Sequence, residues 1–319
     1  MSDPSLSIVV CTLNRARPLK GALASFAAVH KPPGFAYELI VVDNGSTDDT
    51  RAVVESFSER VEPGLRYVYE PRPGLSRARN RAIAEATRAW IWFFDDDVVL
   101  APDWLEGVRC GIERFAQSAA LGGRVVAAFE TTRPAWLSNA LLAYYGATDF
   151  GDRPRLLADG EYPIGANAGF RRDALEKVGG FREDLGHVGR TFGFNEEPEL
   201  VDRLRAAGHT AAYVPQAKVD HRIGAERARL SWLLERAYHG GVYLVRAESS
   251  HRRATRAGAV RKAARALGTI AVGIARGGIT RERQVMYAWQ LGMIRQYAAD
   301  AICPPAADDD CKETGGPAS

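Results

Sequence analysis

Three consecutive carboxylates, Asp95, Asp96 and Asp97, are the residues of this 319-residue sequence best suited to chemistry. They follow an apolar run, residues 90–94, that has the length of a buried strand in a parallel sheet. The carboxyl ends of such strands are where open α/β sheets bind ligands. Clustered carboxylates repel one another unless a cation joins them, and Mg²⁺ or Mn²⁺ prefers such oxygen ligands. A simple turn is the alternative, because Asp is common after strands and Asp103 could cap a following helix.

A further acidic residue, Asp43, ends another apolar segment at residues 37–42. A carboxylate in this position can accept hydrogen bonds from a ribose or from a nucleobase N–H. A turn that Asp43 forms with Gly45 is the competing explanation, since Asp and Gly are both common in turns.

Glu196, Glu197 and His221 are candidates later in the chain. Pro198 suits the first turn of a helix, so Glu196 and Glu197 should lie at a helix N-terminus, where the helix dipole favours anions. Acidic residues in that position commonly act only as caps. A lone histidine such as His221 is more often structural than catalytic.

Strands and helices alternate in the part of the chain that must position these residues. This alternation predicts an α/β fold with a mostly parallel central sheet flanked by helices. A later strand is expected at residues 211–214. Small residues are frequent at 163–172, which suggests backbone close to a ligand, although they also serve close packing. The first expected strands are residues 7–12, 37–42, 65–69 and 90–94, and the helices between and after them are 18–28, 76–87 and 104–117.

The C-terminal part of the sequence changes character. Residues 227–246 and 254–301 predict helices in which basic residues are interleaved with Ala, Leu, Ile and Val. Basic amphipathic helices can bind an anionic membrane surface, but they can also pack on the preceding domain with their charges solvated. Residues 304–319 are polar and are expected to be disordered.

Two templates for nucleotide binding are absent from the sequence. No G-x-G-x-x-G follows the first expected strand and no G-x-x-x-x-G-K-[S/T] occurs, which argues against a dinucleotide-dependent dehydrogenase and a P-loop NTPase. The formal net charge of +3, from 42 basic and 39 acidic residues, gives no reason to expect a nucleic-acid partner.

Cysteine usage and the absence of targeting patterns indicate the compartment. Cys11, Cys110, Cys303 and Cys311 are far apart in the sequence, which favours a reducing environment. The N-terminus has no signal-peptide pattern, and no apolar run approaches the roughly 18 residues that span a bilayer. We therefore expect a cytoplasmic protein, with peripheral contact to the inner membrane face as the alternative.

The motifs gain weight from their order along the chain. They are Thr12-Leu13-Asn14-Arg15, Val41-Val42-Asp43-Asn44-Gly45-Ser46-Thr47-Asp48, Gly74-Leu75-Ser76-Arg77-Ala78-Arg79-Asn80, Phe93-Phe94-Asp95-Asp96-Asp97, Gly165-Ala166-Asn167, Gly179-Gly180-Phe181 and Glu196-Glu197. Together they resemble the family 2 inverting glycosyltransferases with the GT-A fold, over roughly residues 7–241. The resemblance implies a nucleotide-sugar-binding and catalytic GT-A domain at 1–225. The residue patterns described above predict a helical C-terminal extension at 226–303 and a disordered tail at 304–319.

The resemblance also implies where the nucleotide binds. Asp43 is similar to the residue that reads the nucleobase in this family, and Thr12, Asn14 and Arg15 are expected to line the same pocket. Arg79 and Asn80 match the stretch beside the nucleotide in this family. The implied nucleotide-sugar residues are Thr12, Asn14, Arg15, Asp43, Arg79, Asn80, Asp95 and Asp96.

The implied metal ligands are Asp95, Asp97 and His221, with Mn²⁺ or Mg²⁺ as the metal. Asp95 and Asp97 resemble the outer members of the family's D-x-D motif, and Asp97 is the better candidate for a direct bond. Asp96 fills the variable place. His221 is similar to a C-terminal histidine that can complete the metal shell.

The implied catalytic base is Glu197, with Glu196 as the alternative, because the family often has Glu-Asp where this chain has Glu-Glu.

The implied reaction transfers a sugar from a nucleotide-diphosphate sugar to an acceptor hydroxyl on a glycan, lipid-linked glycan or small molecule. UDP is the nucleotide that family likeness favours. A sugar nucleotidyltransferase is a rival, but such enzymes usually have a Gly-rich basic loop that residues 13–17 lack. A non-catalytic sugar-binding protein on the same fold is the other rival.

Overall fold

The structure is a computed structural model, and its contacts divide the chain into two compact units, Met1–Arg236 and Ala237–Ser319. The expected tail at 304–319 lies outside the described residues. The expected domain boundary after residue 225 stays a prediction. The described parts of the chain are residues 5–61, 64–148, 150–189, 192–249, 256–275 and 280–302.

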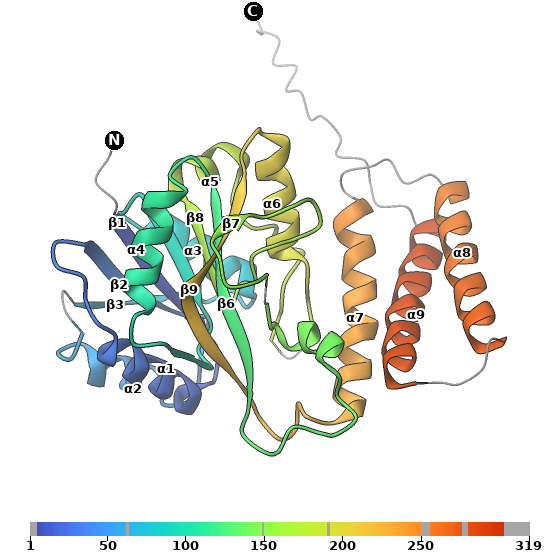
Figure 1. Cartoon of the computed structure of the whole chain (residues 1–319), viewed down its shortest axis with the longest axis horizontal. Helices are drawn as coiled ribbons and strands as arrows, with labels where there is room; N and C mark the ends of the chain where they lie inside the picture. Colours follow the sequence, from blue (N-terminus) through green and yellow to red (C-terminus); the bar gives the residue numbers. More distant parts are fainter. Residues whose placement is uncertain are drawn as a thin grey trace, which may run out of the picture. The chain divides into compact units, whose positions relative to one another are not determined.

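A mixed β-sheet forms the centre of the first unit (Figure 1). Its strand order is β3-β2-β1-β4-β8-β6-β9-β5, and β7 pairs with β9 at the side. The longest pairings, β1 with β2 and β6 with β9, are parallel, which confirms the predicted mostly parallel sheet. The strands are β1 (Ser5–Thr12), β2 (Ala36–Asp43), β3 (Leu65–Tyr69), β4 (Trp90–Phe94), β5 (Val98–Leu100), β6 (Ala120–Phe129), β7 (Arg155–Leu156), β8 (Asn167–Arg171) and β9 (Ala211–Ile223).

Helices cover both faces of this sheet, because alternate residues of each buried strand point to opposite sides. Leu6 and Ile8 of β1 pack with helices α1, α2 and α4, whereas Val9 packs with α3, α5 and α6. The helices of the first unit are α1 (Ala16–Ala28), α2 (Thr50–Phe57), α3 (Leu75–Glu85), α4 (Trp104–Arg114), α5 (Arg172–Val178) and α6 (Glu196–Ala206), with a 3₁₀ helix η1 at Asn139–Tyr145.

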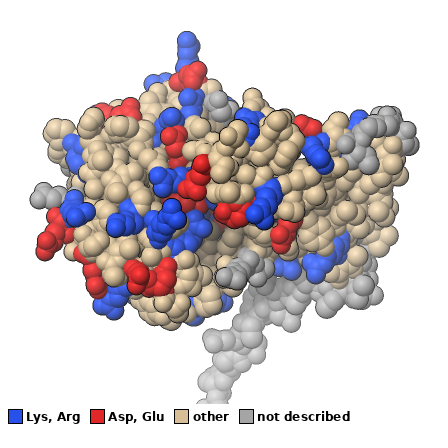
Figure 2. All heavy atoms as spheres, turned by 90° about the horizontal axis from the view of Figure 1, so that it is seen from below, with Lys and Arg blue, Asp and Glu red and all other residues tan. Residues whose placement is uncertain are grey.

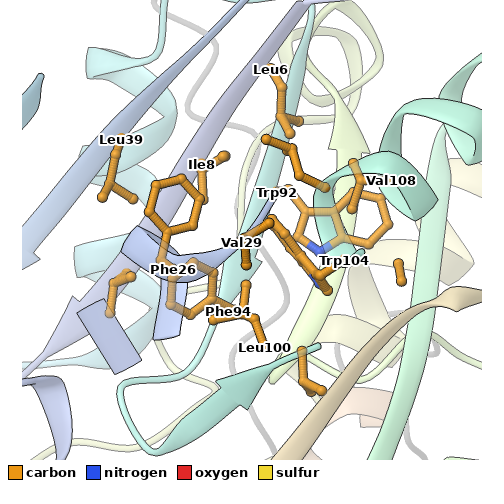
Figure 3. Packing of buried hydrophobic residues seen from close by; sticks show 14 of the residues in the cluster. Leu6, Ile8, Phe26, Val29, Leu39, Trp92, Phe94, Leu100, Trp104 and Val108 are labelled. Carbon is orange, nitrogen blue, oxygen red and sulfur yellow. The ribbon is translucent and has the colours of Figure 1, made fainter. Parts of the chain in front are cut away.

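Aromatic side chains of β4 and α4 pack among aliphatic ones in the core beside β4 (Figure 3). Trp92 and Trp104 meet edge to face with ring centroids 6.0 Å apart, and Phe94 meets Trp104 in the same way at 5.8 Å. Both indole N–H groups donate to Asn167 Oδ1, at 2.9 and 3.1 Å. The run at 90–94 is therefore a strand buried on both faces, as the sequence predicts.

The small residues at 163–172 serve close packing in the described structure. A Cβ on Gly169 would lie 2.3 Å from the Trp92 ring, and one on Gly165 would lie 1.8 Å from Glu197 Oε1. The nearest groups are thus protein side chains. The interpretation of this stretch as backbone lying against a ligand receives no support from these contacts.

The strand expected at residues 211–214 is longer than the sequence predicts. β9 continues through Pro215 to Ile223. Its pairing with β6 shifts in register: Gly123 lies opposite Val214, but Arg124 lies opposite Lys218. The three residues of β9 between these pairs form a bulge, where Pro215 needs no ladder hydrogen bond. The prediction of a short strand was wrong because Pro215 resembles a strand end in a local pattern.

The second unit consists of helices in its described part. α8 (Arg256–Ala275) and α9 (Arg281–Ile302) replace the single helix expected at 254–301, and the last part of α7 (Leu230–Ser249) belongs to the same unit. A Cβ on Gly241 would lie 1.9 Å from the Trp289 carbonyl oxygen, so this glycine lets the backbones of α7 and α9 approach closely. Among the described residues, no helix is long and apolar enough to cross a membrane.

Basic and acidic side chains lie close together on the face drawn in Figure 2. This distribution agrees with the near-balanced formal charge of +3. Nucleic-acid binding usually requires a continuous basic surface. The charge on this face therefore adds no reason to expect such a partner.

Candidate active site

The aspartates lie where the central strand leaves the sheet. β1, β2 and β4 run parallel, so Thr12, Asp43 and Asp95, which end or follow them, share one edge of the sheet. A cavity of about 450 Å³ lies at this edge, a volume typical of small-molecule sites. Its lining includes Thr12, Arg15, Asp95, Asp96, Asp97 and His221.

Asp96 is held by the end of β1 and the loop after it. Thr12 Oγ1 donates a 2.6 Å hydrogen bond to Asp96 Oδ2, and Arg15 Nε donates a 2.7 Å bond to Oδ1. Arg15 Nη2 also reaches Asp97 Oδ2 at 2.6 Å. Burial, together with the charge of Asp97, raises the pKa of Asp96 to about 7 against the opposing effect of Arg15. Thr12 and Arg15 therefore orient the acidic cluster.

His221 reaches the aspartates through strand pairing. β5 begins directly after Asp97 and pairs antiparallel with β9, so that Val98 lies opposite His221. His221 Nε2 then lies 3.1 Å from Asp97 Oδ1, and Nδ1 lies 2.7 Å from the Tyr145 carbonyl oxygen. A carbonyl only accepts, so Nδ1 carries a proton and Nε2 faces the carboxylate.

The set formed by Asp95, Asp97 and His221 suits a divalent metal. One ligand atom from each lies within 4.8 Å of the other two. Carboxylate ligands suit Mn²⁺, and imidazole is a common ligand of divalent transition metals. A histidine whose other nitrogen is bonded to a carbonyl is the usual arrangement of a metal ligand. The residues present therefore fit the metal that the resemblance implies.

The two aspartates of this set differ in the direction of their pKa shifts. Burial raises the pKa of Asp95, and the charge of Asp97 raises it further. Burial also acts to raise the pKa of Asp97, but the hydrogen bond and charge of His221, with Arg15 and Arg227, hold it below its usual range. Asp97 is therefore ionised at neutral pH, as a metal ligand must be.

Glu196 and Glu197 share one guanidinium at the start of α6. Arg79 Nη1 lies 3.1 Å from Glu196 Oε1 and 2.8 Å from Glu197 Oε1. Arg79 and Glu196 are almost fully buried, whereas 14% of the Glu197 side chain is exposed. Burial and the charge of Glu197 raise the pKa of Glu196 to about 8. At neutral pH Glu196 is mostly protonated, and Glu197 is the carboxylate that the solvent reaches.

This raised pKa predicts how stability depends on pH. The pKa of Glu196 is about 8 in the folded chain against an ordinary value of 4.5, so between these values the folded state binds more protons than the unfolded state. The contribution of Glu196 to the free energy of unfolding therefore falls as pH rises from about 4.5 to about 8. In Glu196→Gln this fall is expected to disappear, so its melting temperature should decline less than that of the wild type over this range. An equal decline of the two melting temperatures with pH would contradict the raised pKa of Glu196.

Several residues predicted to bind the nucleotide lie outside the cavity lining. Asp43 accepts hydrogen bonds from Ser46 N and the Tyr67 hydroxyl, both at 2.8 Å. Asn14 Oδ1 accepts a 2.7 Å bond from Thr47 N. Asn80 exchanges two hydrogen bonds with the backbone of Phe181, and Arg79 binds the glutamate pair as described above. In this structure these four side chains position other protein groups, and their direct roles at the nucleotide stay predictions.

The cavity also contains residues that the sequence did not indicate. Arg227 Nη1 lies 3.0 Å from Asp97 Oδ2. Trp232 and Arg236 are four residues apart, so they share one face of α7. The pattern of basic residues in this segment predicts either a membrane-binding or a solvated helix face, and nothing local distinguishes Arg236 from its exposed neighbours. The residues missed include His187, Phe192, Arg227, Trp232 and Arg236.

Solved structures with a similar fold include a mannosyltransferase and the protein TarS. A mannosyltransferase, PcManGT from Pyrobaculum calidifontis in complex with GDP-Man and Mn²⁺, is 22% identical with a TM-score of 0.55, over 96% of this chain and 77% of that chain. S. aureus TarS in complex with UDP is 16% identical with a TM-score of 0.52, over 92% and 89%. The chain has the GT-A fold, with a D-x-D-like cluster at the end of its central strand.

Sequence relatives place the chain more closely among the glycosyltransferases. The succinoglycan biosynthesis protein ExoM of Rhizobium meliloti is 31% identical over 239 residues, 74% of this chain and 72% of that protein. The glucosyl-dolichyl phosphate glucuronosyltransferase of Haloferax volcanii is 24% identical over 241 residues, 74% and 75%. The model of the family described as Glycosyl transferase family 2 matches residues 7–179. The chain belongs to this family and is a glycosyltransferase, as the motifs predict.

Proposed function

We propose that this chain is a metal-dependent, inverting glycosyltransferase that moves a sugar from a nucleoside-diphosphate sugar, with UDP favoured, to an acceptor hydroxyl. The observation that carries the proposal is the convergence of Asp95, Asp97 and His221 within 4.8 Å at the end of the central strand, beside a cavity of about 450 Å³. The names of the two relatives favour a glycan or lipid-linked glycan as the acceptor.

The residues that would hold the metal are Asp95, Asp97 and His221. A divalent metal bound there supplies Lewis-acid stabilisation of the charge that grows on the leaving diphosphate. Arg15 fixes Asp96 and Asp97 through bonds of 2.7 and 2.6 Å, so the carboxylates keep their orientation without a substrate. A preorganised site of this kind needs little rearrangement during the reaction.

Glu197 is the proposed base. Its carboxylate accepts the proton of the acceptor hydroxyl while that oxygen bonds to the anomeric carbon and the bond from this carbon to the diphosphate oxygen breaks. Attack from the face opposite the leaving group inverts the configuration. The 2.8 Å bond from Arg79 orients Glu197, and Glu196 beside it is mostly protonated at neutral pH because its pKa is raised to about 8.

The two rival functions predict different ligand behaviour. A sugar nucleotidyltransferase should bind a nucleoside triphosphate with a sugar phosphate, and a non-catalytic sugar-binding protein should leave the donor intact. A thermal-shift panel of nucleotide sugars, with and without Mn²⁺, tests the proposal, because a ligand that binds only the folded state raises the melting temperature. We expect a manganese-dependent shift with one nucleoside-diphosphate sugar, followed by its slow hydrolysis. A shift with triphosphates alone would contradict the proposal.

Peripheral membrane contact through the C-terminal helices stays part of the proposal. Val260, Leu267 and Ile274 lie seven residues apart on α8, and each is more than half exposed. Arg261 and Arg265 lie on the same helix. Exposed apolar and basic residues together favour an anionic bilayer surface.

Sedimentation with vesicles tests this contact. The full chain is expected to sediment with vesicles that contain phosphatidylglycerol and to stay unbound with phosphatidylcholine alone. Leu267→Glu should weaken the binding several-fold, because it places a negative charge between the exposed apolar residues Val260 and Ile274 of α8. Leu156→Glu, at an equally exposed position of β7, should leave it unchanged. Equal binding by the two variants would contradict the role of α8.

A further inference from the structure

Arg236 is an arginine of the cavity wall that pairs with no described carboxylate. Two other arginines of the wall are paired, Arg15 with Asp96 and Asp97 and Arg227 with Asp97, at 2.6 to 3.0 Å. The hydrogen bond described for Arg236 joins its Nε to the Tyr144 carbonyl oxygen. The N–H groups of both terminal nitrogens are therefore left for a group inside the cavity.

Aromatic rings hold this guanidinium in place. Its central carbon lies 4.6 Å from the ring centroid of Phe194 and 5.4 Å from that of Trp232. Arg227 lies over the same Trp232 ring at 5.2 Å. The rings restrict both side chains, so little conformational entropy remains to be lost when a ligand binds.

Two guanidiniums on one ring make this part of the cavity strongly cationic. Burial, with the charge of Arg227 in addition, lowers the pKa of Arg236 to about 10, which still leaves it charged at neutral pH. Burial and the charges of nearby arginines also lower the pKa of His187 to about 4, so His187 is neutral. Its buried Nδ1 has no hydrogen-bond partner among the described residues. Arg236 is thus a buried cation that has no ion pair with a described carboxylate. Such a group costs stability, and its presence in a cavity wall favours a ligand-binding role.

We propose that Arg236, with Arg227 beside it, forms a subsite for a phosphoryl group of a substrate. Forked guanidinium donors match the geometry of phosphate oxygens, and two adjacent guanidiniums suit a doubly charged group better than a single carboxylate. The subsite deepens the proposed function and rests on it for the nature of the substrate. Either the diphosphate of the donor or a phosphoryl group on the acceptor has this chemistry.

Binding of inorganic pyrophosphate to the full chain, measured by calorimetry without divalent metal, tests the subsite. We expect Arg236→Gln to weaken this binding roughly tenfold or more, since it removes a charge-assisted pair of hydrogen bonds. Arg236→Met, which keeps an unbranched stem against the rings, is the second variant if the first does not fold. Arg229→Gln removes the same charge from an exposed arginine of the same segment and should change the affinity less than twofold.

The outcomes separate the two sources of the phosphoryl group. A parallel loss of UDP affinity in the Arg236 variants identifies the donor diphosphate, whereas unchanged UDP affinity with weakened pyrophosphate binding identifies a group on the acceptor. Wild-type affinity for pyrophosphate in a folded Arg236 variant, or no pyrophosphate binding by the wild type, would overturn the subsite. If pyrophosphate binding weakens as expected but no nucleotide sugar shifts the melting temperature, the subsite stands and the proposed function fails.

Discussion

Glu197→Gln is expected to lower kcat by a factor of about 10² to 10⁴, the range typical of a lost general base. The amide keeps an oxygen that can accept the bond from Arg79 Nη1, which is 2.8 Å long in the structure, so the site should stay assembled. Donor binding should also stay near that of the wild type, because the substitution leaves the aspartates and His221 unchanged. Steady-state kinetics with the donor found in the thermal-shift panel, combined with donor titration, measures both quantities.

Glu196→Gln is the matched control for this prediction. Glu196 is 4% exposed and mostly protonated at neutral pH, so its amide variant removes little charge. We expect less than a tenfold change in kcat. A larger loss in Glu196→Gln than in Glu197→Gln would move the base to Glu196 and reverse the roles within the pair.

Asp97→Asn is expected to remove the manganese-dependent part of donor binding. Asp97 combines a contact to His221 at 3.1 Å with ion pairs to Arg15 and Arg227, so its charge is the common partner of three side chains. Loss of a supporting contact at a metal site typically costs 10- to 100-fold in affinity, and loss of a ligand should cost about 100-fold or more. Titration of Mn²⁺ by electron paramagnetic resonance, with and without UDP, measures the effect.

Asp103→Asn provides the control for this second prediction. Asp103 precedes α4, is exposed and makes no capping hydrogen bond, so the substitution changes the same functional group away from the cavity. Its manganese affinity should equal that of the wild type. Equal affinity in Asp97→Asn as well would show that the ion binds without Asp97.

The parts of the site that sequence patterns predict are those that local structure determines. The apolar run at 90–94 has the length of a buried strand, so the position of Asp95, Asp96 and Asp97 at its end follows from local pattern. The helix start at Glu196 and Glu197 follows in the same way from Pro198. These features depend on residues within a few positions of one another.

The rest of the site depends on contacts between distant segments. Family likeness indicates His221, but local patterns predict that the strand that carries it ends at residue 214, because the bulge around Pro215 forms only against β6. Arg79 was expected beside the nucleotide, and its bonds to Glu196 and Glu197 join residues more than 100 positions apart. Arg236 enters the cavity only because α7 places it beside Phe194. No local pattern specifies such contacts.

The proposed reaction requires a divalent ion between Asp95, Asp97 and His221. Anomalous diffraction from crystals soaked with Mn²⁺ and UDP tests it most directly. We predict one manganese peak in bonding contact with the aspartate carboxylates and His221 Nε2, with the diphosphate on the same ion. A map without manganese at this edge of the sheet, or with the nucleotide bound elsewhere, would contradict this requirement.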